Sequence, residues 1–216
     1  MKILAISDQR LPEMLRQEYL RQNYGDAEFI ISCGDMEPSY LEFVSTALTL
    51  PLFFVRGNHD NHYEPGKPGG QDLHMQFQHY RGLRLLGLEG SMYYNGKNVQ
   101  YTEEQMALNI LQLMPRLMIY RQLHGFSLDY LVTHSPARGI HDRSDVTHQG
   151  FRSFRWLLRW ARPKYMIHGH VDVWDRRDIV ETQYHGTRII NINPKRVLHP
   201  YQDYDKPIRS AKKVSE

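Results

Sequence analysis

Seven residues that could bind a metal or move a proton each follow closely after a short apolar stretch of the sequence. They are Asp8, Asp35, Asn58, His59, Asp60, His134 and His170. Carboxylate, amide carbonyl and imidazole groups together suit Mn²⁺, Fe²⁺ or Zn²⁺, whereas Ca²⁺ prefers oxygen ligands alone. Each residue by itself has a simpler explanation, because aspartates cap helices and lone histidines are usually held by hydrogen bonds. A metal site therefore requires a fold that brings these residues together.

The apolar stretches have the length and composition of buried strands. Predicted strands cover residues 2–7, 28–33, 51–56, 83–88, 128–132, 164–167 and 187–192. Helices are predicted after Pro12, after Pro38, after Thr102 and around Phe154. The alternation of strands and helices predicts a parallel sheet. Because ligand sites form beyond the carboxyl ends of such strands, we expect the polar residues to meet there.

The third predicted helix contains both a starting signal and an interruption. Thr102 and Gln105 have the spacing of a capping box, which opens a helix. Pro115 lies inside the same helical pattern and lacks a backbone N–H. We therefore expect the helix to begin after Thr102 and to bend or stop at Pro115.

Four successive motifs resemble those of the calcineurin-like metallophosphoesterases. They are Cys33-Gly34-Asp35, Gly57-Asn58-His59-Asp60, His134 and Gly169-His170. The resemblance covers residues 1–193 and implies an α/β fold, a four-layer α/β/β/α sandwich with mixed sheets. It also implies hydrolysis of phosphate monoesters or diesters with one or two divalent metal ions (Mn, Fe or Zn), which polarise the phosphoryl oxygens.

The resemblance also assigns roles to individual residues. It implies one complete metal site whose ligands are Asp35, Asn58, His134 and His170, with Asp35 bridging to a second metal. His59 matches a histidine that is not a ligand and that protonates the leaving oxygen. Asp60 would orient His59. The expected catalytic residues are therefore His59 and Asp60.

The other metal site departs from the family pattern at two positions. Arg10 stands where the family's Asp-x-His motif has histidine, and Asp172 stands at the second histidine of Gly-His-x-His. A guanidinium has no lone pair to give a metal. Two interpretations stay open: Arg10 and Asp172 form an ion pair in place of a metal, or Asp8, Asp35 and Asp172 hold an oxygen-rich metal while Arg10 clamps phosphate.

Substrate contacts are expected from Arg10, His141 and His168. His141 lies in a segment that resembles a bacterial branch of the family, and His168 is placed behind the metal ligands. An alternative register would make His168 a ligand with His170, but Ile167 would then occupy the usual glycine position. The expected partner is a phosphorylated small molecule. The rival hypothesis is a catalytically impaired family member that binds a phosphate ligand or acts in regulation.

Length and composition limit the remaining classes of protein. The chain has 216 residues, 41% apolar residues and a formal charge of +3, which favours one globular domain over residues 1–193. The mild charge does not support a nucleic-acid partner. With one cysteine, no basic leader and no apolar run of about 20 residues, we expect a cytoplasmic protein without a membrane span. Residues 194–216 are predicted to be a docked or disordered tail, and the oligomeric state is open.

Overall fold

The computed structural model describes residues 1–60, 63, 68–96, 99–175 and 178–204. Its two larger sheets contain five and six strands. The first sheet has the order β13 (Lys195–Leu198), β1 (Ile3–Ile6), β2 (Phe29–Ser32), β3 (Leu52–Phe54), β4 (Gln71–Asp72). The second has the order β11 (Glu181–Tyr184), β12 (Thr187–Asn191), β10 (Tyr165–His168), β9 (Tyr130–Thr133), β6 (Leu83–Leu88), β5 (Phe77–Tyr80). β7 (Ser91–Met92) and β8 (Gln100–Tyr101) form a small separate pair.

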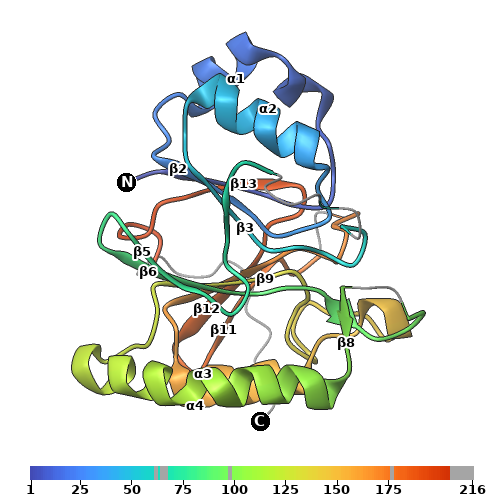
Figure 1. Ribbon diagram of the computed structural model, residues 1–216, viewed down its shortest axis with the longest axis vertical. Helices are drawn as coiled ribbons and strands as arrows, with labels where there is room; N and C mark the ends of the chain where they lie inside the picture. Colours follow the sequence, from blue (N-terminus) through green and yellow to red (C-terminus); the bar gives the residue numbers. More distant parts are fainter. Residues whose placement is uncertain (61–62, 64–67, 97–98, 176–177, 205–216) are drawn as a thin grey trace.

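Helices cover the outer face of each sheet, so the molecule has four layers (Figure 1). The 3₁₀ helix η1 (Pro12–Leu15) and the helices α1 (Gln17–Tyr24) and α2 (Pro38–Leu48) lie on the first sheet. The helices α3 (Glu103–His124) and α4 (Arg152–Ala161) lie on the second. A second 3₁₀ helix, η2 (Val146–His148), precedes α4. The expected α/β/β/α sandwich with mixed sheets is confirmed.

Strand β1 shows why both faces of the first sheet are buried. Ile3 and Ala5 pack into the core between the two sheets, while Leu4 and Ile6 pack into the core under α1 and α2. Successive side chains of a strand point to opposite faces, so an unbroken apolar run suits a strand covered on both sides. The run before Asp8 therefore fixes where that aspartate leaves the sheet.

Helix α3 continues through Pro115, so the prediction that the helix stops there is wrong. The capping box is present, because the Thr102 side chain accepts from Gln105 N and the Gln105 side chain accepts from Thr102 N. An interior proline costs about 3 kcal/mol. Burial of Leu113 and Leu117 on either side of it contributes about 1.5–3 kcal/mol for each side chain, which outweighs that cost.

The region after residue 193 is docked as far as the structure describes it. Strand β13 pairs antiparallel with β1, with Ile3 opposite Leu198, so it completes the edge of the first sheet. Residues 205–216 lie outside the described residues. Among the described helices, none combines the length and apolarity that crossing a bilayer requires.

Candidate metal centre

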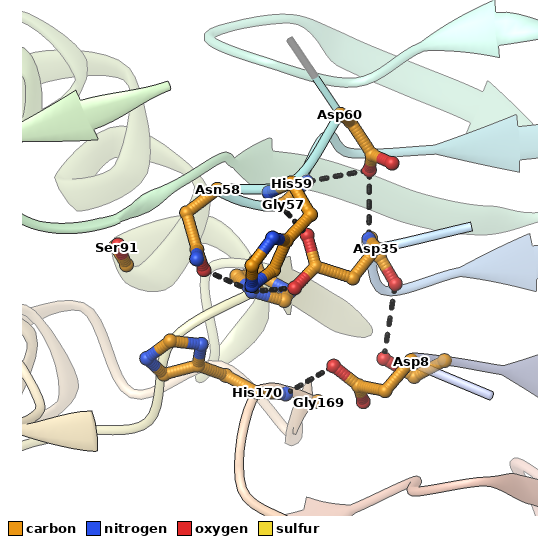
Figure 2. A network of polar contacts seen from close by, with 12 residues as sticks. Asp8, Asp35, Gly57, Asn58, His59, Asp60, Ser91, Gly169 and His170 are labelled. Carbon is orange, nitrogen blue, oxygen red and sulfur yellow. Dashed lines mark hydrogen bonds and ion pairs between the residues drawn. The ribbon is translucent and has the colours of Figure 1, made fainter. Parts of the chain in front are cut away.

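The carboxyl ends of β1, β2, β3, β9 and β10 meet at one edge of the two sheets and bring the expected ligands together. In Figure 2, Asp8, Asp35, Asn58 and His170 surround a common space. This arrangement is the one expected from the order of strands and polar residues along the chain. It depends on strands from both sheets, because β1, β2 and β3 belong to the first sheet and β9 and β10 to the second.

The backbone at this edge is held in conformations that most residues avoid. Asp8, Asp35 and His170 have φ angles of 65°, 54° and 67°. Such conformations cost free energy and persist where surrounding contacts enforce them, often at functional sites. A Cβ on Gly169 would lie 2.5 Å from Asp8 Oδ2, and one on Gly34 would lie 2.8 Å from His134 Nδ1. Both glycines are therefore required for the close approach of the strand ends.

Asp35, His134 and His170 offer ligand atoms that all lie within 4.8 Å of one another. His134 Nδ1 is 2.8 Å from the carbonyl oxygen of Cys33, so this nitrogen carries a proton. Its Nε2 lies 3.0 Å from Asn58 Oδ1 and 3.3 Å from Asp35 Oδ2. If Nε2 carries no proton, three lone pairs face one space, which is the environment of a cation.

In the metal-free protein, a proton on His134 Nε2 allows this nitrogen to donate to the oxygens that face it. Burial opposes the charged imidazole, but the Asp35 carboxylate outweighs burial and raises the pKa of His134 to about 9. Burial likewise opposes ionisation of Asp35, and the charge of His134 overcomes it and lowers the pKa of Asp35 to about 2. A proton on Nε2 and a metal are thus alternative ways to fill the same position.

His170 is kept neutral and oriented. Its Nε2 lies 2.6 Å from the carbonyl oxygen of Thr147, so Nε2 carries the proton and Nδ1 keeps the lone pair. Burial lowers the pKa of His170 to about 3. Its ring centroid is 4.7 Å from that of His134 and 5.3 Å from that of His148. A neutral imidazole with a fixed tautomer is the form that binds a metal.

Tyr94 fixes the Asn58 side chain and was not predicted from the sequence. Asn58 Nδ2 donates to Tyr94 Oη over 3.0 Å, which turns Oδ1 towards His134. Tyr94 lies in the segment between β7 and β8, where Gln100 Oε1 accepts from the backbone N–H groups of Tyr94 and Asn95. No motif marks Tyr94, so its role comes from the tertiary fold.

Asp8 contributes an unsatisfied oxygen to the centre. Its Oδ1 accepts from His170 N over 2.9 Å, whereas Oδ2 is buried and lacks a hydrogen-bond partner among the described residues. Burial raises the pKa of Asp8. A buried carboxylate oxygen without a partner is costly unless a cation or proton meets it. Together with the convergent ligands and the glycine contacts, this oxygen shows that the residues fit a divalent metal.

In the altered half of the centre, the polar side chains form hydrogen bonds and ion pairs with neighbouring side chains. Asp172 Oδ1 accepts from Gln9 Nε2 over 3.1 Å and from Asn193 Nδ2 over 3.0 Å. Arg10 Nη1 instead lies 2.6 Å from Glu37 Oε2. The ion pair between Arg10 and Asp172 that was one sequence interpretation does not form, because each group has a nearer partner. Gln9 and Asn193 are further residues that the sequence motifs did not indicate.

His59 and Asp60 have different positions. His59 is exposed beside a cavity of 260 Å³ that Asp35, Glu37 and Tyr63 also line, and its backbone N–H donates to Asp35 Oδ1. The Asp60 carboxylate accepts from the backbone N–H groups of Asp35, Met36 and Gly57. Burial, together with the charge of Asp35, raises the pKa of Asp60 to about 7. Asp60 thus ties the turn after β3 to the loop after β2.

His168 and His141 form a separate pair beside the centre. His168 is fully buried, its Nδ1 donates to Gly169 O, and its Nε2 lies 3.0 Å from His141 Nδ1. His141 Nε2 lies 2.9 Å from Thr182 Oγ1. His141 and Asp172 line a cavity of 420 Å³, and His168 stands behind His141. The alternative register in which His168 binds the metal is therefore not the arrangement seen.

Fold and site together define a metal-binding α/β sandwich protein. The chain belongs to the calcineurin-like phosphoesterase family, whose model matches residues 2–173. This membership confirms the family that the four motifs resemble. The family is one of phosphoesterases, and membership leaves the activity and the substrate of this chain open.

The chain is similar to several solved structures of distant sequence. The chain is similar to the protein TT1561 of Thermus thermophilus, with 15% identity, a TM-score of 0.58 and 88% of each chain covered. It is also similar to Vps29 complexed with Zn²⁺ from Entamoeba histolytica, with 14% identity and a TM-score of 0.41 over 89% of this chain and 73% of that one. A predicted phosphoesterase from Streptococcus pneumoniae has 10% identity and a TM-score of 0.35, over 88% and 71% of the two chains. A comparison with curated proteins finds no match.

Proposed function

We propose that this protein is a metal-dependent hydrolase of phosphate monoesters or diesters. The observation that carries the proposal is the convergence of Asp35 Oδ2 and Asn58 Oδ1 on His134 Nε2, at 3.3 Å and 3.0 Å, with His170 beside them. Mixed oxygen and nitrogen ligands favour Mn²⁺, Fe²⁺ or Zn²⁺ as the ion. When bound, such an ion supplies Lewis-acid stabilisation of the phosphoryl oxygens and activates water.

The residues of the chain would divide the remaining tasks. His59, exposed at the cavity beside Asp35, would donate a proton to the leaving oxygen. Asp60 would act through the backbone, because its carboxylate holds the amides of Asp35 and Gly57. His170 and His134 keep their second ring nitrogens bonded to carbonyl groups, which fixes the lone pairs that face the centre.

We further propose two metal positions that differ in their affinity for the ion. The stronger would use Asp35, Asn58, His134 and His170. The weaker would use Asp8, Asp35 and Asp172, and the unpaired Asp8 Oδ2 supports it. Because Asp172 already accepts two hydrogen bonds through Oδ1, its remaining oxygen is the one that would bind. An oxygen-only site of this kind suits Fe²⁺ or Zn²⁺ less well than a site with imidazole ligands.

The substrate would be a phosphorylated small molecule. The 420 Å³ cavity that His141 and Asp172 line is large enough for part of such a molecule beyond its phosphate. His168 would position His141 through their hydrogen bond and would not touch substrate. Arg10 contacts Glu37 through Nη1, and both side chains are about half exposed, so its other guanidinium N–H groups would be the ones to contact phosphate. A cytoplasmic location is part of this proposal, and the single buried Cys33 is compatible with it.

Metal content and turnover together test the proposal. Protein purified without chelator should contain a divalent metal and should hydrolyse bis-p-nitrophenyl phosphate or p-nitrophenyl phosphate when Mn²⁺ is added. EDTA should abolish both activities. The relative rates on the two esters distinguish a diesterase from a monoesterase. Protein that holds no metal and turns over neither ester would contradict the proposal.

The altered half of the centre favours a second candidate function. Arg10 and Asp172 replace two expected histidines, so the protein could bind a phosphorylated ligand without hydrolysing it. In that case the protein would contain metal and bind inorganic phosphate or a phosphorylated ligand, but both ester substrates would remain intact. The same two measurements therefore separate the candidates.

A further inference from the structure

The outer layer formed by α3 and α4 exposes many large apolar side chains. Seven of them are 38% to 70% exposed: Leu108, Leu111, Met118, Ile119, Leu123, Trp156 and Trp160. We call these seven residues the α3–α4 face. In the opposite outer layer, which Figure 1 shows at the other end of the molecule, the large apolar side chains exposed among the described residues are Leu15 and Phe43. An exposed apolar surface concentrated in one layer indicates an interaction surface.

Contacts at the edges of the second sheet show which side of α3 faces the sheet edge and which side faces α4. Arg116 of α3 packs over Phe77 of the edge strand β5, with 4.2 Å between its guanidinium carbon and the ring centroid. At about 100° per residue, Leu111 and Met118 lie about 140–160° around the helix from Arg116. They are thus on the side of α3 that faces away from β5 and towards α4.

Helix α4 is turned in the complementary direction. Arg155 packs over Tyr184 of the other edge strand, β11, at 5.3 Å. Trp160 lies about 140° around the helix from Arg155, on the side towards α3. Arg121 of α3 donates to the backbone oxygen of Trp160, so the two helices lie next to each other there. Leu111, Met118 and Trp160 therefore lie along the seam between the two helices. By the same rule Leu108 and Ile119 lie about 60–80° and Leu123 about 20° around α3 from Arg116, so the exposed surface extends from the seam across the outer side of α3.

After the first turn of α3, which contains Glu103 and Glu104, the charge of this layer has one sign. From Gln105 to the end of α3 and throughout α4 there is no aspartate or glutamate. The same segments carry Arg116, Arg121, Arg152, Arg155 and Arg159. Arg152 and Arg159 are exposed on the same helix face as Trp156. The α3–α4 face is therefore apolar and aromatic with a cationic border.

We propose that the α3–α4 face docks on the surface of an anionic phospholipid bilayer. Exposed leucine and tryptophan side chains can enter the boundary between headgroups and acyl chains, and arginines can pair with lipid phosphates. From Leu108 to Leu123 the apolar residues extend about 22 Å along α3, which suits a broad surface. A second copy of the chain is a poorer occupant, because a twofold contact would bring together two surfaces that both have a cationic border.

Vesicle binding tests this proposal with the metal removed. In EDTA, the protein should co-sediment with vesicles of phosphatidylglycerol and phosphatidylcholine, and binding to phosphatidylcholine alone should be at least about tenfold weaker. Raising NaCl from about 0.1 M to about 1 M should weaken binding, because exposed charges are then screened. In a Trp174→Phe background, the fluorescence of Trp156 and Trp160 should shift to shorter wavelength when vesicles are added.

Paired variants assign the binding to the face. Trp156→Ser with Trp160→Ser, and separately Arg152→Gln with Arg159→Gln, should each weaken vesicle binding about tenfold or more. The matched control, Leu15→Ser with Phe43→Ser on the opposite layer, should bind as the parent does. Thermal melting of each variant shows whether it folds.

Three outcomes would overturn the proposal. The first is a parent protein that does not bind the anionic vesicles. The second is a set of folded variants that all bind like the parent. The third is a parent protein that does not bind vesicles but forms a dimer, where sedimentation detects the dimer and the tryptophan variant does not form it. That result would assign the face to a second copy.

Discussion

The two halves of the metal centre differ in what their inward-facing polar atoms contact. In the half built from Asp35, Asn58, His134 and His170, the atoms that face inward share one space, and other contacts hold each side chain from behind. In the half around Asp172, the carboxylate is met by Gln9 and Asn193. The comparison teaches that a metal ligand is indicated by where its inward-facing atom lies, and not by the residue type alone.

The largest effect should come from removing a ligand of the complete half. His134→Ala deletes the nitrogen that lies between Asn58 Oδ1 and Asp35 Oδ2, so the stronger metal should be lost altogether. Metal content after dialysis measures this loss. His141→Ala is the matched control, because His141 lies outside the cluster and should leave metal content unchanged. Equal metal content in His134→Ala and the parent would show that His134 is not a ligand of the stronger metal, which would contradict the distinction between the halves.

The next largest effect should fall on turnover without metal loss. His59→Ala removes a proton donor that is exposed at the cavity, and the rate should fall by about 10² to 10⁴. Its metal content should equal that of the parent, since the contact of His59 with Asp35 uses the backbone N–H. If the variant loses its metal, His59 is itself a ligand and must be added to the residues of the complete half.

A smaller effect should come from the support behind a ligand. Tyr94→Phe removes the hydroxyl that accepts from Asn58 Nδ2, so metal affinity should fall about 10- to 100-fold. The ring remains, so the melting temperature of the metal-free protein should change little. Co²⁺ absorption spectra should shift in the variant if the Asn58 oxygen moves. An unchanged affinity and spectrum would show that Asn58 needs no such support.

The smallest effect, for each pH unit, should be a pH dependence of metal affinity. The pKa of His134 is raised to about 9, so the imidazolium pair with Asp35 stabilises the metal-free fold fully below pH 6.5, and this contribution is lost as pH rises through about 9. A metal must displace that proton, so affinity should rise by up to about tenfold per pH unit between pH 7 and 9. Calorimetry in buffers of different protonation enthalpy should detect about one proton released per ion at pH 7. Release of no proton would mean that His134 is neutral before the metal binds.

The sequence could indicate the ligands of the complete half because each follows a strand whose apolar run is unambiguous. Asp35 and Asn58 follow the ends of β2 and β3, and the parallel pairing of these strands then puts them at one edge. The partners of Asp172 could not be predicted in this way. Gln9 and Asn193 are separated by more than 180 residues and meet because β13 returns to pair with β1.

Pro115 and Tyr94 show two further limits of the sequence patterns. Pro115 has a strong local effect, but the packing of α3 on the second sheet overrides it. Tyr94 lies in a segment without periodicity, and its contact with Asn58 exists only in three dimensions. Local signals thus predict strand ends well and predict contacts between distant loops poorly.

Metal titration of the apo protein with anomalous scattering to locate the ions tests the central claim most directly. The account predicts one strong peak between Asp35, Asn58, His134 and His170, and a weaker peak near Asp8 and Asp172 that appears at higher metal concentration. Arg10→His with Asp172→His should strengthen the second peak, because it adds two imidazole ligands. Two peaks of equal strength in the parent, or no peak beside His134, would contradict the account.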